Sequence, residues 1–427
     1  MKSRMRFLAR SRGCARAEST MPSPPSRDPV PVTGTGRPDL QELRGRATRR
    51  AWAEIDLGAV RDNVRALRSA LRGTPRLMAV VKADAYGHGA VAVSRAALAA
   101  GAEWLGVATT DEGVELRRAG ITSPILLLGS TPAEDAETAV AHDLSVTVFQ
   151  PEIAGALSQA ASRTGRPAKI HFKVDTGMGR IGVAPSDAAA VLRQVSAYAG
   201  IVVEGCFTHF ATADDADLGP ARKQLETFLA VLRGVVGRGL PIGLRHAANS
   251  AAFLALPEAH FDIVRAGIAV YGVPPAPHLA GRVPLRRVMR LRARVAHTKR
   301  VPSGTPIGYG HTYRTPRETR IATIPIGYAD GYPRLAGETR EVLLNGRRAR
   351  VVGRIAMDQC MVDAGVLPVE VGDEVEIWGE KVPVEEVAAT AQTIAYEVLT
   401  HVGRRVPRVF VQDGQVVGVR TLLAEGG

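Results

Sequence analysis

A lysine ends an apolar run near residue 80, where its position could make it reactive. The run Leu77–Lys82 has the β-branched, apolar composition of a buried strand, and a loop with Gly87 and Gly89 follows it. A lysine at the C-terminal end of such a strand is partly removed from water, which lowers its pKa and makes the amine nucleophilic toward an aldehyde. Taken alone, such a lysine is far more often an ordinary surface lysine that ends a strand.

Four further apolar runs end in polar or ionisable residues. The segments are 173–180 (KVDTGMGR), 208–210 (THF), 246–250 (HAANS) and 265–267 (RAG). In a barrel of parallel strands, the carboxyl ends share one rim, and active sites of that architecture lie there. Each residue alone could be a satisfied core or loop residue. Five converging strand ends predict an active site at the rim.

Eight short apolar runs, mostly separated by amphipathic stretches, would position these residues. The runs are Leu77–Lys82, Trp104–Ala108, Ile125–Gly129, Leu144–Phe149, Lys169–Asp175, Ile201–Thr208, Gly243–Ala247 and Asp262–Ala266. Eight strands alternating with helices predict a (β/α)₈ TIM-type barrel. A doubly wound open sheet is the alternative, but no G-x-G-x-x-G follows the first strand, which excludes its usual dinucleotide-binding form.

The pattern changes after about residue 285. Segments such as TRIATIPIG, REVLLNGRRARVVGRI and DEVEIWG are short, alternating and β-prone, with one helix-like stretch, VPVEEVAATAQT, among them. A chain of 427 residues also exceeds the usual size of a single core. The sequence therefore predicts three parts: a disordered basic extension (1–48), the barrel (49–285) and a mainly β domain (286–427).

Charge and cysteine content exclude several other classes of protein. Residues 1–50 hold twelve basic and four acidic residues, so most of the net charge of +13 belongs to the N-terminal end. The rest has no dense basic run with interleaved aromatics, which argues against nucleic-acid binding, and no apolar window long enough for a membrane span. Cys14, Cys206 and Cys360 are too scattered for a disulfide framework or zinc site. We expect a reducing, cytoplasmic compartment and no metal.

Nine segments together resemble the bacterial alanine racemase family and occur in its order. They are VVKADAYGHG, KVDTGMGRIG, FTHFATAD, HAANS, VRAGIAVYG, IGYGHTY, GYADGY, GRIAMDQ and TIAYEV. The resemblance covers essentially residues 50–420, and the last four segments lie in the predicted β domain. The resemblance implies a barrel followed by a β domain, pyridoxal 5′-phosphate (PLP) as cofactor, a homodimer with shared sites, and interconversion of L- and D-alanine.

The resemblance also implies the catalytic residues. Lys82 would bind PLP covalently and act as a base on one face of the substrate α-carbon, while Tyr309 of the partner subunit would act on the other face. Two bases on opposite faces provide the proton removal and return that racemisation requires. Arg265 would donate to the pyridine nitrogen, and His209 would lie between Arg265 and Tyr309. On the residues alone, Tyr309 could be a turn aromatic and His209 a satisfied core histidine.

The remaining site residues follow from the same resemblance. The PLP phosphate would be held by Tyr86, Ser250, Gly267, Ile268 and Tyr396. A carbamylated Lys173 would orient Arg180, and the partner's Met357 and Asp358 would approach the substrate carboxylate. An entry corridor would include Asp214, Tyr328 and Arg354. The chain departs from many relatives by having Asp rather than Asn at position 84.

Three alternatives share part of this pattern. A racemase of serine or of a larger or basic amino acid would differ only in its pocket walls, and a PLP decarboxylase of the same architecture would not need Tyr309. A non-catalytic PLP-binding protein would need neither Tyr309 nor the second domain. The pattern favours alanine racemisation that supplies D-alanine for peptidoglycan.

Overall fold

The computed structural model describes residues 40–335, 340–423, 425 and 426. Within these residues the strands form an eight-stranded sheet, an eleven-stranded sheet and a two-stranded ribbon. None of the helices in this part of the chain is long and apolar enough to cross a membrane.

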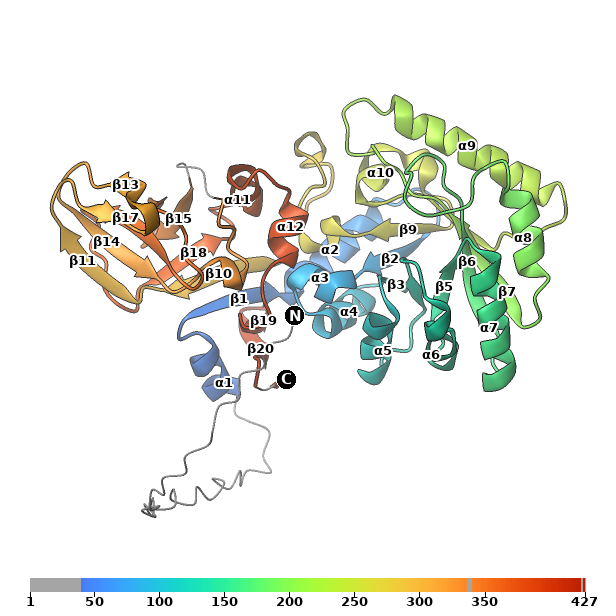
Figure 1. Cartoon of the computed structure of the whole chain (residues 1–427), viewed down its shortest axis with the longest axis horizontal. Helices are drawn as coiled ribbons and strands as arrows, with labels where there is room; N and C mark the ends of the chain where they lie inside the picture. The colour runs from blue at the N-terminus through green and yellow to red at the C-terminus, as the bar shows by residue number, and fades with distance from the viewer. Residues whose placement is uncertain (1–39, 336–339, 424, 427) are drawn as a thin grey trace, which may run out of the picture. The chain divides into compact units, whose positions relative to one another are not determined.

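The eight-stranded sheet is parallel and nearly closed, which confirms the predicted barrel (Figure 1). Backbone bonds from Asp262 N to Arg245 O (3.0 Å) and from Arg265 N to Ala248 O (3.1 Å) link its two outermost strands. In sheet order the strands are β8 (Leu244–His246), β7 (Ile201–Phe207), β6 (Ala168–Lys173), β5 (Ser145–Val148), β4 (Ile125–Leu127), β3 (Trp104–Val107), β2 (Arg76–Val80) and β9 (Ile263–Ala266). Each strand overlaps one of the eight predicted runs.

Helices alternate with these strands and begin or end at recognisable signals. Thr109 and Glu112 form a capping box at the start of α5, and Gly165 ends α7 in a left-handed conformation. The helices are α2 (Leu57–Ser69), α3 (Lys82–Gly87), α4 (Ala90–Ala99), α5 (Thr110–Arg118), α6 (Ala136–Ala141), α7 (Pro151–Thr164), α8 (Ala188–Ser196), α9 (Gly219–Val236) and α10 (Ser250–Ala255).

The second sheet confirms the mainly β region. Its order is β11-β14-β17-β16-β15-β18-β10-β1-β19-β20-β21. The strands are β1 (Ala51–Asp56), β10 (Met289–Arg294), β11 (His297–Val301), β14 (Thr319–Ile324), β15 (Glu341–Leu344), β16 (Arg347–Val352), β17 (Cys360–Gly365), β18 (Glu374–Trp378), β19 (Arg408–Gln412), β20 (Gln415–Arg420) and β21 (Glu425–Gly426). The ribbon pairs β12 (Pro306–Ile307) with β13 (Tyr313–Arg314), and two helices, α11 (Val384–Thr390) and α12 (Ala395–Thr400), accompany the sheet.

The N-terminal part of the described chain differs from the prediction. β1 falls in the range predicted for the barrel, yet it pairs with β10 and, in parallel, with β19 of the second sheet. Residues predicted to be disordered form helix α1 (Leu40–Ala47), because Leu43 and Ala47 are buried against Trp52 and the β19–β20 strands. The burial partner is remote in sequence, so local composition could not indicate it. Residues 1–39, with Cys14, lie outside the described residues.

Candidate active site

A cavity of about 710 Å³ lies at the C-terminal ends of the barrel strands. Its lining includes ten residues that the sequence predicted for the site: Lys82, Tyr86, Lys173, Arg180, His209, Ser250, Arg265, Gly267, Ile268 and Tyr396. They come from β6 and β9, from the segments that follow β6, β7 and β9, and from α3, α10 and α12. Residues far apart in sequence therefore meet around one space.

The loop after Lys82 has an unusual backbone. Ala83, Asp84, Ala85 and Tyr86 all have φ of +53°, so α3 makes a left-handed turn of four non-glycine residues. Left-handed helical geometry costs L-residues about 1–2 kcal/mol each. Such a turn persists only where surrounding contacts compensate for this cost.

Side chains from the C-terminal strands provide those contacts. Arg408 is buried and donates from Nε and Nη2 to Gly87 O, at 3.0 and 2.9 Å. Arg420 donates to both carboxylate oxygens of Asp84, whose Oδ1 also accepts from Ala90 N at 2.9 Å. Although burial alone would raise the pKa of Asp84, the hydrogen bond from Arg420 lowers it. We call these contacts the C-terminal clamp.

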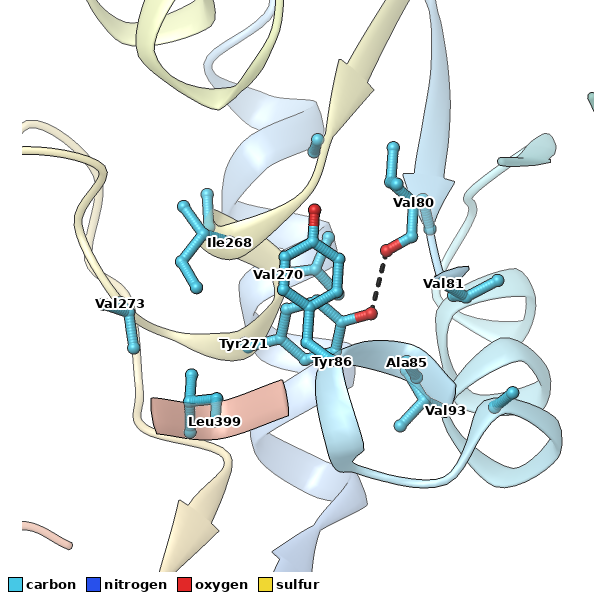
Figure 2. Close-up of a cluster of buried hydrophobic side chains, with 14 of the residues drawn as sticks. Val80, Val81, Ala85, Tyr86, Val93, Ile268, Val270, Tyr271, Val273 and Leu399 are labelled. Carbon is cyan, nitrogen blue, oxygen red and sulfur yellow. Dashed lines mark hydrogen bonds between the residues drawn. The ribbon is translucent and has the colours of Figure 1, made fainter. Parts of the chain in front are cut away.

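Beneath the turn, two aromatic rings pack into the hydrophobic core (Figure 2). Tyr271 donates its hydroxyl proton to Val80 O at 2.8 Å, and its ring centroid lies 4.8 Å from that of Tyr86. The Tyr86 hydroxyl points away from that bond and lines the cavity. The end of β2 is therefore anchored immediately before Lys82.

Lys82 itself is partly buried at the cavity wall. Burial lowers the pKa of its amine, the positive charge of Arg180 lowers it further, and Glu112 opposes the change. Glu112 accepts from Ala83 N and Ala108 N, both at 2.7 Å, so its carboxylate also holds the start of the loop. An amine with a lowered pKa has more of the unprotonated form that attacks a carbonyl carbon.

Arg265 is the most connected side chain of the site. Its Nη2 donates to Thr208 O (2.9 Å), Ala247 O (2.9 Å) and His209 Nδ1 (3.1 Å), and its Nη1 donates to His246 Nδ1 (2.8 Å). Burial and the charge of Arg265 hold the pKa of His209 well below its usual value, so the imidazole is neutral. Among the described residues, the Arg265 Nε–H has no protein acceptor and remains available.

Lys173 and Arg180 lie on the same wall of the cavity. Lys173 is 3% exposed, and its amine lies 5.1 Å from the centroid of the Phe207 ring. Burial, then the charges of Arg265 and Arg180, lower the pKa of Lys173 to about 7. The amine is therefore substantially neutral near neutral pH.

Hydroxyl and backbone N–H groups gather at the other end of the cavity. Ser250 Oγ accepts from Gly267 N at 2.9 Å, and the Tyr86 and Tyr396 rings lie 6.0 Å apart. A Cβ at Gly267 would lie 2.7 Å from the Tyr86 hydroxyl, so only glycine permits this approach. Burial raises the pKa of Tyr86 to about 12, which keeps its hydroxyl a donor.

Three predicted residues, Tyr309, Met357 and Asp358, do not line this cavity. Tyr309 lies in the short helix η5 (Tyr309–His311), between β12 and β13, and is 71% exposed. Met357 is 53% exposed, and Asp358 accepts from Arg405 at 2.7 Å. The corridor residues Asp214, Tyr328 and Arg354 are also exposed, and none lines the cavity.

Sequence reasoning missed several residues of the site. Glu112, which holds the Lys82 loop, could have been found only as the last residue of a capping box. His171 and Glu204 lie behind Arg265 and interrupt otherwise apolar strands, a signal that was present but unused. Four polar side chains of the lining had also not been given a role: Ser130, Asn249, Glu397 and Thr400.

The fold and site define an enzyme with a lysine of lowered pKa at a barrel rim and a second, β domain. The family model described as "Alanine racemase, N-terminal domain" matches residues 55–275, and "Alanine racemase, C-terminal domain" matches residues 288–410. The chain belongs to the alanine racemase family.

Individual relatives agree over nearly their whole lengths. The alanine racemase of Desulfovibrio desulfuricans is 50% identical over 85% of this chain and 99% of its own length. That of Desulforamulus reducens is 49% identical over 84% and 98%. The crystal structure of alanine racemase from Streptomyces lavendulae is similar with a TM-score of 0.82 and 46% identity, covering 85% of this chain and 97% of that one.

Proposed function

We propose that this enzyme interconverts L- and D-alanine with bound PLP by a two-base mechanism that uses Lys82 and Tyr309. The observation that carries the proposal is the cavity in which Lys82, Arg265 and a cluster of hydroxyl and N–H donors face one space. The names of the relatives support alanine as the substrate.

The residues of the cavity fit PLP. Lys82 offers an amine of lowered pKa for the aldehyde, and Arg265 Nε–H is a spare donor for the pyridine nitrogen. Tyr86, Ser250 and the backbone at Gly267 offer neutral donors for the phosphate. Ile268 and Tyr396 complete this phosphate group in the proposal. PLP, when bound, takes up the electron pair left at the α-carbon when the proton is removed.

Lys82 and Tyr309 would exchange the α-proton on opposite faces of the substrate. Arg265 donates to His209 Nδ1, so the single proton of the neutral imidazole resides on Nε2. A donor at that position would stabilise Tyr309 as the phenolate, the form that accepts a proton. Because arginine stays protonated, Arg265 would donate to the pyridine nitrogen without giving up its proton, and the cofactor would then be a weaker electron sink than one paired with an acidic partner.

The substrate carboxylate would meet a cationic wall. Arg180 would bind it, oriented by Lys173 in its carbamylated form, and the partner's Met357 and Asp358 would contact it from outside the barrel. The exposure of Tyr309 and Met357 supports a homodimer in which each β domain completes the other subunit's site. The corridor of Asp214, Tyr328 and Arg354 would lead to it.

The decisive experiment measures D-alanine formed from L-alanine by the purified protein, with and without added PLP. We expect PLP-dependent formation that Lys82→Ala abolishes and Lys169→Ala leaves intact, since Lys169 pairs with Asp143 away from the cavity. Absence of D-alanine from protein that retains PLP would overturn alanine as the substrate. Exchange of the α-proton for deuterium without loss of CO₂ would distinguish a racemase of serine or a basic amino acid from a decarboxylase.

The cellular role follows from the product. D-Alanine is a component of peptidoglycan, so the proposed role is its supply for cell-wall synthesis in the cytoplasm. Neither nucleic acid nor a metal has a part in the proposal. A non-catalytic PLP-binding role is the second candidate, which racemisation by the purified protein would eliminate.

A further inference from the structure

Two histidines that the proposed reaction does not use connect Arg265 to a carboxylate inside the barrel. His246 Nδ1 lies 2.8 Å from Arg265 Nη1, and His246 Nε2 lies 2.8 Å from His171 Nδ1. His171 Nε2 lies 3.3 Å from Glu204 Oε2. Both imidazoles are fully buried. We call His171 and His246 the histidine bridge.

Hydrogen-bond chemistry fixes the direction of every proton in the bridge. Arginine can only donate, so His246 Nδ1 accepts and the His246 proton lies on Nε2. That proton is donated to His171 Nδ1, which places the His171 proton on Nε2, facing Glu204. Burial lowers the pKa of both imidazoles, which keeps them neutral. All donors therefore point from Arg265 toward Glu204.

The surrounding residues are shaped to accept the bridge. A Cβ at Gly205 would lie 2.3 Å from His171 Nδ1, so the strand must have glycine there. The register of β6 and β7 shifts between Ile170 and His171, opposite this glycine. Phe207 stacks on His246 with ring centroids 4.6 Å apart and planes 5° apart. The rings therefore have little freedom to turn.

The bridge compensates for an isolated charge. Arg265 is buried, and no carboxylate of the described residues lies within ion-pair distance of it. A buried charge without a counter-charge is costly. Burial alone would raise the pKa of Glu204, but hydrogen bonds from His171 and Ser145 lower it, so Glu204 is an anion. Successive hydrogen bonds in such a chain polarise one another, so part of the stabilising effect of the Glu204 charge reaches Arg265.

We infer that Glu204, acting through the histidine bridge, is a positioning residue that holds the Arg265 guanidinium in place and supports its charge. For catalysis, the inference rests on the proposed role of Arg265 at the pyridine nitrogen. Glu204 would then influence the electronic character of the cofactor through the histidine bridge, without touching cofactor or substrate.

The first test needs no variant and no activity. In protein labelled with nitrogen-15 at histidine, we expect His171 and His246 both to be neutral with the proton on Nε2. A nitrogen–nitrogen coupling across the shared proton would identify the pair, because it arises only where two imidazoles share a hydrogen bond. A proton on Nδ1 of either ring, or a charged ring, would overturn the inference whether or not the enzyme is a racemase.

The second test uses Glu204→Gln, which removes the charge and preserves the shape. A hydrogen bond to a charged group is stronger than a neutral one by a free energy that corresponds to roughly a tenfold change in a rate or equilibrium constant. We therefore expect kcat to fall about tenfold with KM nearly unchanged. The absorption band of bound PLP should shift, and Glu204→Asp should restore both properties in part.

The control is Glu103→Gln, the same change at a carboxylate that accepts from Leu77 N in the barrel and has no bond to the bridge. It should leave kcat and the PLP band unchanged. If Glu204→Gln loses only thermal stability, with kcat and the PLP band unchanged as in the control, Glu204 is merely structural and the inference is wrong. If the wild-type protein forms no D-alanine, the proposed function fails, while the tautomers and the PLP band still decide the inference.

Discussion

At the scale of single residues, Lys173 shows how the cavity sets the chemistry of a side chain. Burial and two neighbouring guanidinium groups lower its pKa to about 7. A neutral amine can react with CO₂: the nitrogen bonds to the carbon, one proton is released, and a carbamate anion results. Reaction would place an anion beside Arg180, which attracts the guanidinium, whereas the protonated amine would repel it.

The carbamate should therefore form more readily as pH rises. Below pH about 7 the amine is mostly protonated and unreactive, and above it the neutral form dominates. With carbon-13-labelled CO₂, we expect the carbamate signal to increase from one pH unit below this value to one unit above. Lys173→Ala should lack the signal. A signal that is constant or falls over that range would contradict the assignment of the modification to Lys173.

The site residues that could be predicted from the sequence share one property. Each lies within two residues of the C-terminal end of an apolar strand, and a barrel gathers such positions at one rim: Lys82, Lys173, His209 and Arg265. His171 and Glu204 lie inside strands, where the alternation of inward and outward side chains decides whether a polar group reaches the interior. The register shift beside His171 changes that alternation, and a single sequence does not indicate it.

At the scale of elements, the left-handed turn after Lys82 depends on a close approach to α12. Gly87 has φ of +81°, and a Cβ there would lie 2.3 Å from Leu399 O. Gly120 has φ of +80° but open space around it. Substitution at Gly120 therefore tests the effect of the backbone conformation alone on stability, and substitution at Gly87 adds the effect of the contact with α12.

We expect Gly120→Ala to lower the free energy of unfolding by about 1 kcal/mol, because only the backbone conformation is strained. Gly87→Ala should lower it by about 3 kcal/mol or more, since backbone atoms must also move. It should also weaken PLP retention, because the shifted backbone would displace Lys82. Chemical denaturation of both variants measures the difference. Equal losses would show that contact with α12 does not determine the turn.

The eight barrel strands were predictable because each is a local apolar run flanked by helical sequence. The second sheet was only partly predictable: β1 and β19 pair in parallel although the whole barrel lies between them. Local alternation indicates that a segment is a strand but does not identify a partner so remote. The helix α1 was missed for the same reason.

At the scale of the whole molecule, the proposed shared site predicts complementation between two inactive variants. Lys82→Ala and Tyr309→Phe would each remove one base. In a mixed dimer, one site contains both substitutions and the other contains neither. Random mixing after subunit exchange should therefore restore about a quarter of wild-type activity. Mixing either variant with itself is the control. No recovery in dimers shown to be mixed would place both bases in one chain.

The C-terminal clamp has a consequence for how the enzyme is made. Every residue that lines the cavity precedes Arg408, yet Arg408 and Arg420 hold the loop of Lys82, and Arg408 lies 321 positions after Gly87. The barrel segment, with Lys82, is therefore synthesised before the strands β19 and β20 that hold its loop. A chain that ended prematurely before β19 would contain the full lining of the cavity but not the contacts that stabilise it. We expect such fragments to retain no cofactor, so that only finished polypeptides withdraw PLP from the cell's supply.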